Sequence, residues 1–132
     1  MNLRSFFMQK IMREIKFRGK RVDNGEWVYG YYYMYNFKHI ISSEDHSDDV
    51  DSYYNDEVIP ESVGQFTGLQ DKNGVDIYEG DVYHQGDKNI KYKVVFKDGC
   101  FMGNQIGNKS LAGLYYFLKD IEVTGNIHTN KL

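Results

Sequence analysis

The chain has 132 residues, of which 41% are hydrophobic, and it holds 12 Tyr and 8 Phe against one Pro. This size and composition predict a packed domain rather than a disordered chain, and the many aromatic rings favour strands over helices. The formal net charge of −3 gives no overall attraction for nucleic acid, and one Cys excludes an intramolecular disulfide and an all-cysteine zinc site. No apolar run approaches the roughly 18 residues of a membrane helix, so we expect a cytoplasmic protein.

The first predicted elements are an N-terminal extension and a strand. Residues 1–12 form the extension, and the apolar spacing from Phe6 to Ile15 predicts a short helix there. From Ile15 the sequence alternates, which predicts a half-buried strand with a basic outer face formed by Lys16, Arg18 and Lys20.

An aromatic strand follows a strong turn signal. Asp23-Asn-Gly25 favours a tight hairpin, because Asn and Gly accept a positive φ. The run over residues 26–35 predicts a long strand in which Gly30 marks a bulge or bend. With a third strand over 37–41, residues 13–41 are expected to form a hairpin packed on the rest of the domain.

An acidic segment comes next. Residues 41–61 hold eight acidic side chains and no basic one. We predict that residues 42–57 form an exposed loop outside the core, since they have too few apolar side chains to offset the entropy of ordering. The segment suits a solvated loop, a self-association surface or a partner-repelling surface. Its carboxylates are suitable ligands for a hard cation, but the calcium-loop pattern is missing, so no metal is predicted.

The C-terminal part predicts a compact β unit. Short alternating segments punctuated by Asp71-Lys-Asn-Gly74 and Asp98-Gly99 predict a small barrel or roll over residues 62–132. Further expected elements are a short edge strand at 58–60, strands near 76–83, 90–96 and 121–128, and one short helical turn over 111–118. Cys100 is expected to be buried as a small apolar side chain.

One pattern occurs twice, at an offset of 49 residues. The segments from Phe17 to Tyr29 and from Phe66 to Tyr78 share one motif: Phe-x-Gly, any four residues, Asn-Gly, any two residues, and an apolar residue followed by Tyr. Two hairpins with Asn-Gly turns need only these features, so reused hairpin chemistry is favoured over duplication, which stays open.

No arrangement of residues points to catalysis. The sequence lacks phosphate-binding glycine loops and the Gly-x-Ser-x-Gly motif, and its four histidines have no metal-ligand spacing. Glu61, Asp76, Glu79 and Asp81 offer carboxylates, but Asp76 and Asp81 flank a strand, where such groups commonly bind turn amides. We therefore predict no enzymatic activity and no cofactor. A deep pocket with mutually hydrogen-bonded ionisable side chains would count against this.

The sequence supports a binding surface more strongly than a catalytic site. Basic side chains for phosphates stand next to rings for stacking, an arrangement found in single-strand binders. Core packing or a subunit contact is the favoured interpretation, followed by a partner protein and then by nucleic acid. The candidate residues are Lys16, Arg18, Lys20, Arg21, Trp27, Tyr29, Tyr31, Tyr33 and Tyr35.

Two blocks of sequence resemble the YopX-like proteins of phages and prophages. The first is Glu14-Ile-Lys-Phe-Arg-Gly-Lys20 with Trp27-Val-Tyr-Gly30. The second runs from Val63-Gly-Gln-Phe-Thr-Gly68 through Asp71-Lys-Asn-Gly74 to Ile77-Tyr-Glu-Gly-Asp-Val82, and Ile121-Glu-Val-Thr-Gly-Asn-Ile127 closes the match. The resemblance implies a YopX-like domain over 13–132, mainly β with an SH3-like barrel component, a tendency to form homo-oligomers, and a phage or prophage origin. It implies no catalytic residues.

Overall fold

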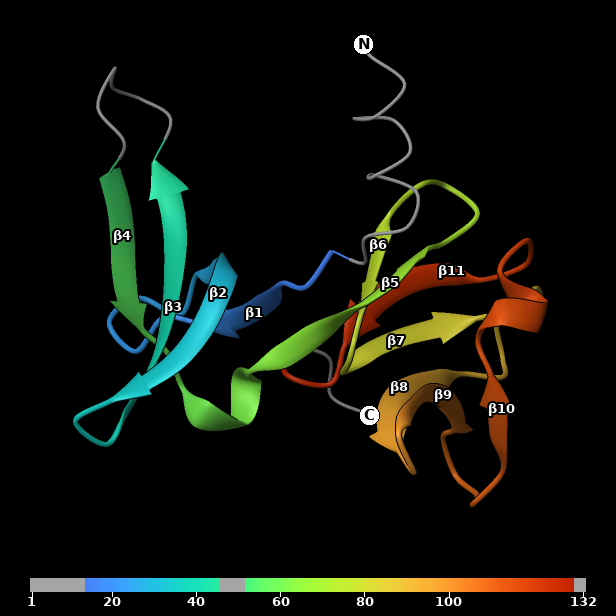
Figure 1. The fold of residues 1–132 in the computed structure, drawn as a ribbon. Helices are drawn as coiled ribbons and strands as arrows, with labels where there is room; N and C mark the ends of the chain where they lie inside the picture. The colour runs from blue at the N-terminus through green and yellow to red at the C-terminus, as the bar shows by residue number, and fades with distance from the viewer. Residues whose placement is uncertain (1–13, 46–51, 130–132) are drawn as a thin grey trace, which may run out of the picture.

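Strands account for nearly all the regular structure in the part of the chain that the structure describes (Figure 1). The computed structural model describes residues 14–45 and 52–129. Residues 6–13 of the helix predicted over 6–15 lie outside these ranges, and residues 14 and 15 are not helical. The first elements are β1 (Phe17–Lys20), β2 (Trp27–Tyr35), β3 (Lys38–Asp45), β4 (Ser52–Glu57), the 3₁₀ helix η1 (Pro60–Ser62) and β5 (Gly64–Gln70). They are followed by β6 (Asp76–Tyr78), β7 (Asp81–His84), β8 (Tyr92–Lys97), β9 (Cys100–Gln105), β10 (Leu111–Gly113), the 3₁₀ helix η2 (Tyr115–Phe117) and β11 (Glu122–Asn126). Within these ranges, no helix is long and apolar enough to cross a membrane.

The strands form two antiparallel sheets. One has the order β4-β3-β2-β1-β5-β6 and the other the order β10-β9-β8-β7-β11. The predicted mainly β class with few, short helices is therefore confirmed. Neither strand order returns to its first strand within the described residues, so the sheets stay open and no closed barrel is formed by strand pairing.

The hydrophobic core lies where β5 and β6 meet the five-stranded sheet. Its buried side chains are Ile77, Tyr83, Val94, Leu114 and Ile121, with Leu69, Tyr92, Phe101, Leu118 and Val123 packed around them. All ten residues come from the segment predicted to be compact, residues 62–132. Since burying one large apolar side chain is worth roughly 1.5–3 kcal/mol, this cluster is a major source of stability.

The N-terminal strands are fastened to this core at β1. A Cβ atom on Gly19 would lie 3.0 Å from the Val58 side chain, which is almost fully buried. The Ser62 hydroxyl accepts a hydrogen bond from the Lys20 amide at 2.8 Å. The sheet continues through β1 into β5, with Phe17 opposite Gln65. In Figure 1, β2, β3 and β4 consequently extend away from the core on one side of the molecule.

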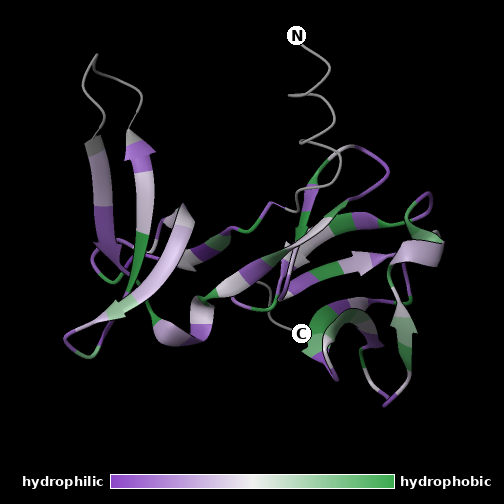
Figure 2. Ribbon diagram, in the orientation of Figure 1, coloured by the Kyte–Doolittle hydropathy of each residue, from purple (hydrophilic) through white to green (hydrophobic). Residues whose placement is uncertain are grey.

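The prediction that residues 42–57 form a loop is wrong. Its ends belong to β3 and β4, which pair from Ile40↔Glu57 to Asp45↔Ser52. Both faces of this hairpin carry polar side chains, so no hydrophobic alternation marks the strands, and backbone pairing holds them instead. Figure 2 shows β3 hydrophobic near its start and hydrophilic toward its end. None of the described side chains in this segment is buried, which agrees with its expected place outside the core.

Four smaller expectations also differ from the structure. Val58 forms only an isolated bridge and Pro60 begins η1, so residues 58–60 are not a strand. Cys100 is exposed, because it begins β9 directly after a turn. The short helical turn predicted over 111–118 is present only in its second half, as η2, whereas residues 111–113 form β10. Of the bulge or bend expected at Gly30, no bulge is present, since the pairing of β2 shows no register shift. An added Cβ there would lie 2.0 Å from the Ser42 carbonyl oxygen, so glycine permits close approach of β3.

The repeated pattern occupies the β1–β2 and β5–β6 hairpins. Gly25 and Gly74 share a positive φ, +73° and +79°. Gly68 has a φ of +84° at the point where the β5–β6 register shifts, whereas the equivalent Gly19 has no positive φ. The two hairpins share turn chemistry but not strand geometry, which favours reuse of hairpin chemistry over duplication.

Replacement of Gly103 tests the packing of the core. A Cβ there would lie 1.7 Å from the buried Tyr83 hydroxyl oxygen, so Gly103→Ala should lower the free energy of unfolding by about 1–3 kcal/mol through overpacking. Gly113→Ala is the control, because its Cβ would meet only Tyr116 at 3.8 Å. Urea unfolding measures both, and equal stability of the two variants would contradict this packing.

Candidate functional site

A buried ion pair links β1 to β7. Arg18 Nη2 lies 2.8 Å from Asp81 Oδ1, and the two side chains are 8% and 3% exposed. The second carboxylate oxygen accepts a hydrogen bond from the Tyr78 amide at 2.8 Å, so the predicted binding of a turn amide is confirmed for Asp81. Burial raises the pKa of the Asp81 carboxyl above its ordinary value, against the opposing effects of Arg18 and of that amide.

Aromatic rings surround the guanidinium of this pair. Its central carbon lies 4.7 Å from the Trp27 ring centroid and 4.9 Å from the Tyr78 ring centroid. Such cation–π contacts contribute about 2 kcal/mol when the cation is desolvated. Arg18 Nε is buried and has no hydrogen-bond partner among the described residues, so the rings offset part of its lost hydration.

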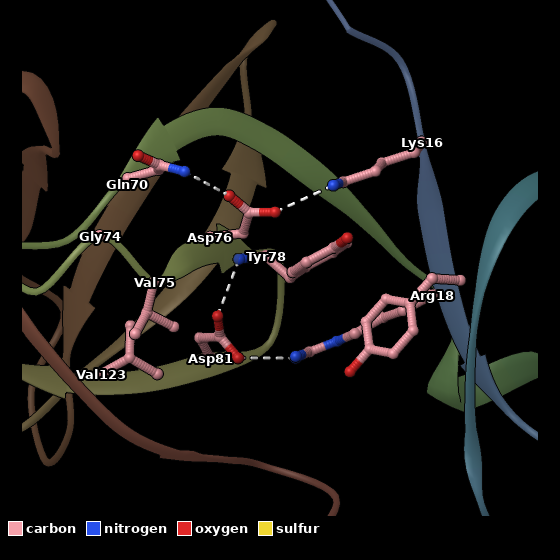
Figure 3. Close-up of a pocket in the computed structure, with 10 residues that line it drawn as sticks. Lys16, Arg18, Gln70, Gly74, Val75, Asp76, Tyr78, Asp81 and Val123 are labelled. Atoms are coloured by element: carbon pink, nitrogen blue, oxygen red, sulfur yellow. Dashed lines mark hydrogen bonds and ion pairs between the residues drawn. The ribbon is translucent and has the colours of Figure 1, made fainter.

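A cleft of about 550 Å³ opens beside the ion pair (Figure 3). Within it, Lys16 Nζ lies 2.9 Å from Asp76 Oδ2, and the Gln70 amide donates a hydrogen bond to the other oxygen at 3.0 Å. The lining residues are Lys16, Arg18, Tyr29, Gln70, Gly74, Val75, Asp76, Tyr78, Asp81 and Val123. The cleft thus combines two neutralised ion pairs with two aromatic rings and two valines.

Three ionisable groups of the cleft, Lys16, Asp76 and Tyr78, have pKa values that keep their ordinary charge states at neutral pH. Burial tends to lower the pKa of Lys16, but its hydrogen bond to Asp76 and nearby charges outweigh this and raise it. Burial tends to raise the pKa of Asp76, but hydrogen bonds from Gln70 and Lys16 lower it. Burial raises the pKa of Tyr78. The lysine and the aspartate therefore stay charged, and the tyrosine stays neutral.

This cleft bears directly on the predicted lack of enzymatic activity. It holds two hydrogen-bonded ionisable pairs, the arrangement that counts against that prediction. Each carboxylate is bound to a cation, however, and no His, Cys or Ser among the described residues lines the cleft. Its residues supply binding groups but no nucleophile with a neighbouring base. The absence of catalysis remains a prediction.

Other acidic and histidine side chains have separate positions. Glu61 and Glu79 line a second hollow, of about 210 Å³, together with His128. Asp71, which the sequence marked only as a turn residue, is buried and accepts backbone N–H groups from Asn73, Val75 and Val123 at 2.8–3.0 Å. In residues 14–45 and 52–129, no three His, Cys, Asp or Glu side chains gather closely enough to hold a metal ion.

The expected basic face of β1 is not an open surface. Arg18 is buried and Lys16 is paired in the cleft, while Arg21 pairs with Asp23 at 2.8 Å and Asp56 at 3.5 Å. Lys20 Nζ lies 5.7 Å from the Trp27 ring centroid. The prediction failed because β1 lies between two strands and its charged side is covered by rings from β2 and β6.

The tyrosines of β2 divide into two groups. Tyr29 lines the cleft, where its ring meets Tyr78 edge to face at 5.7 Å. Beyond it, Tyr31 and Tyr35 are 68% and 71% exposed, and the Tyr33 hydroxyl donates a hydrogen bond to Asn55 at 3.0 Å. Alternation places these three on one side of the sheet, opposite the side that buries Ile41. We call Tyr31, Tyr33 and Tyr35, with Tyr53 of β4, the tyrosine face.

Sequence reasoning missed one prominent residue beside this face. Phe37 in the β2–β3 turn is 97% exposed. Asn36 and Phe37 have φ of +53° and +63°, a conformation that favours Gly at the second position. A bulky side chain is held there at a cost of about 1–2 kcal/mol without contributing to the core. The run of aromatic residues hid this turn, because only the Asn gave a signal.

A family model described as YopX protein matches residues 16–132. The chain belongs to this family. The matched region contains the cleft, the buried ion pair and the tyrosine face. The crystal structure of protein EF1440 from Enterococcus faecalis is similar, with a TM-score of 0.60 and 22% identity, covering 90% of this chain and 96% of that one. This likeness shows a shared fold. No match is found among curated proteins.

The buried pair of this YopX-family chain is tested by removing one charge. Asp81→Asn should lower the free energy of unfolding by about 3–5 kcal/mol, because it leaves the Arg18 cation buried without its partner. Asp76→Asn is the matched control; its partly exposed pair with Lys16 should cost less than about 1 kcal/mol. Urea unfolding at neutral pH measures both. A loss at Asp81 no greater than at Asp76 would contradict the assigned role.

The pH dependence of stability tests the surroundings of His128. Burial, with the charges of Arg18 and Lys20, lowers the pKa of this imidazole in the folded state. Between that pKa and the unfolded value near 6.5, the unfolded chain binds the proton more readily, so His128 makes stability fall as the pH drops through this window. Unfolding at about pH 7.5 and pH 5.5 should show a smaller loss for His128→Asn than for the natural chain. Equal losses would rule this out.

Proposed function

We propose that this YopX-family chain is a self-associating, non-catalytic structural or adaptor protein. In this proposal it is encoded by a phage or prophage and acts in the cytoplasm of the bacterial host. Its tyrosine face packs against another subunit, and the assembly binds a phage or host protein. The proposal rests on the exposed aromatic side chains of β2 and β4.

The main support for this proposal is the amount of aromatic surface that is exposed outside the core. Tyr31, Tyr35 and Tyr53 are exposed on one side of the β2–β4 hairpins, and Phe37 extends the aromatic area at the turn. Single exposed rings are ordinary, but a contiguous patch is typical of an interaction site. Tyrosine is enriched in such interfaces, because its ring buries a large area while the hydroxyl keeps a hydrogen bond.

The conformation of Phe37 supports the same proposal. Backbone strain is usually retained where the surrounding structure or a function requires it. Phe37 contributes almost no burial within the subunit, so a contact outside the subunit accounts best for a large ring at a positive φ.

Nucleic-acid binding through residues 16–35 is the alternative function. It has less support, because Lys16, Arg18 and Arg21 are already paired with carboxylates. The chain also carries a net negative charge. An oligonucleotide bound through this region would have to displace those pairs, at a cost that the phosphate contacts must exceed.

Light scattering after size-exclusion chromatography tests the proposal. The natural chain should have a mass above 15.5 kDa that rises with concentration. Tyr31→Thr/Tyr35→Thr should shift the mass toward the monomer, because Thr keeps strand propensity but removes both rings. Tyr115→Thr/Tyr116→Thr is the matched control, since these tyrosines are equally exposed on η2, outside the proposed contact.

Two outcomes would contradict the proposal. One is a natural chain that stays monomeric at all concentrations. The other is a Tyr31→Thr/Tyr35→Thr variant with the natural mass. A monomer that binds single-stranded oligonucleotides, with an affinity that falls steeply with salt, would favour the alternative function.

A further inference from the structure

A groove on the five-stranded sheet carries unpaired positive charge. It has a volume of about 360 Å³ and is lined by Lys93, Val95, Phe96, Lys97, Asn104, Asn108, Lys109 and Leu111. Lys93, Val95 and Lys97 alternate on one side of β8, opposite the side on which Val94 is buried in the core. We call this surface the lysine groove.

The groove differs in charge from the rest of the chain. Residues 85–110 hold five Lys and two Asp, a formal charge of 5 − 2 = +3 in a chain of −3. Within the described parts of the chain, none of the three groove lysines forms an ion pair, in contrast to the paired cations of β1. Val95 of β8 and Leu111 of β10 supply apolar lining on the lysine side, whereas the Phe96 ring, which borders the groove, lies on the opposite side of β8 against Phe101. The groove therefore offers an apolar floor with a cationic rim.

We infer that the lysine groove of one subunit receives the tyrosine face of a second copy of this chain. The inference rests on the proposed self-association and names its second surface. The charges are complementary, because Glu44 and Glu57 share the side of the sheet that carries the tyrosine face, and residues 41–61 as a whole hold eight acidic side chains and no Lys or Arg. The apolar parts also match, since the tyrosine rings would pack on the Val95 and Leu111 side chains.

The strand register places acidic groups beside the tyrosines. Glu57 lies opposite Ile40, which in turn lies opposite Tyr33, and Glu44 lies opposite Tyr53. Residues opposite one another share a face of the sheet, so these two carboxylates lie on the face of the exposed rings, together with one cation, Lys38, opposite Tyr35. The Glu57 carboxylate pairs with Lys38 at 4.0 Å, and this long, exposed ion pair neutralises it only weakly.

This charge distribution disfavours contact between two tyrosine faces. A symmetric pair would bring two acidic hairpins together and create like-charge repulsion. Contact with the lysine groove replaces that repulsion with attraction. The two surfaces of the contact are then different, which makes it heterologous, so the assembly closes into a ring or continues as a filament.

Two complementary variants test the inference. Lys97→Glu/Lys109→Glu changes only the groove, and Tyr31→Thr/Tyr35→Thr changes only the tyrosine face. Each alone should weaken association about tenfold or more and approach the monomer mass. Their 1:1 mixture should form a dimer, because one intact groove and one intact face remain. Lys88→Glu/Lys91→Glu is the control, with the same charge change outside the groove, and should assemble like the natural chain.

Salt and oligonucleotide measurements complete the test. Raising NaCl from about 50 mM to about 500 mM shortens the Debye length from about 14 Å to about 4 Å and should reduce the mass. If the groove variant keeps the natural mass while the tyrosine variant is monomeric, the inference fails and the proposed function stands. A monomeric natural chain overturns both. Loss of single-stranded oligonucleotide binding in the groove variant, with unchanged mass, would show that the groove binds nucleic acid instead.

Discussion

The buried contact between Arg18 and Asp81 constrains the rest of the structure. Two charges removed from water are stable only when they are close, hydrogen-bonded and held in a fixed geometry. The Tyr78 amide fixes the carboxylate, and the Trp27 and Tyr78 rings lie against the guanidinium. These contacts set the position of β1 relative to β7, and the Gly19–Val58 packing reinforces that position.

This anchoring explains why the molecule has a compact part and an extension. The core side chains come from β5 onward, whereas β2, β3 and β4 continue the first sheet beyond the anchor. The contacts around Arg18 and Asp81, which anchor β1, pair or cover the basic groups of β1. The extension formed by β2, β3 and β4 therefore presents tyrosines and carboxylates but few free cations. The three groove lysines lie on β8 and in the β9–β10 connection. The two ends of the molecule thereby differ in charge, which is the basis of the proposed head-to-tail contact.

Part of this arrangement was predictable from the sequence. The turns at Asp23-Asn-Gly25 and Asp71-Lys-Asn-Gly74, the aromatic strand and the mainly β class follow from local rules for hairpins and alternation. The burial of Arg18 does not, because alternation gives the side of a strand but not what covers that side. Strand β4 was missed since neither of its faces is apolar. The lysine groove was missed because its residues come from β8 to β10 and meet only through strand pairing.

The most direct test of the anchor compares unfolding at the two ends of the molecule. The fluorescence of Trp27, which is the only tryptophan, reports on the Arg18 contact, and amide hydrogen exchange of Val82 and Val94 reports on the core. In the natural chain, both probes should give one free energy of unfolding. In Arg18→Met, the fluorescence change should come at lower urea than loss of core protection, because the strands of the extension detach first. Coincident transitions in Arg18→Met would contradict the claim that this ion pair holds the extension to the core.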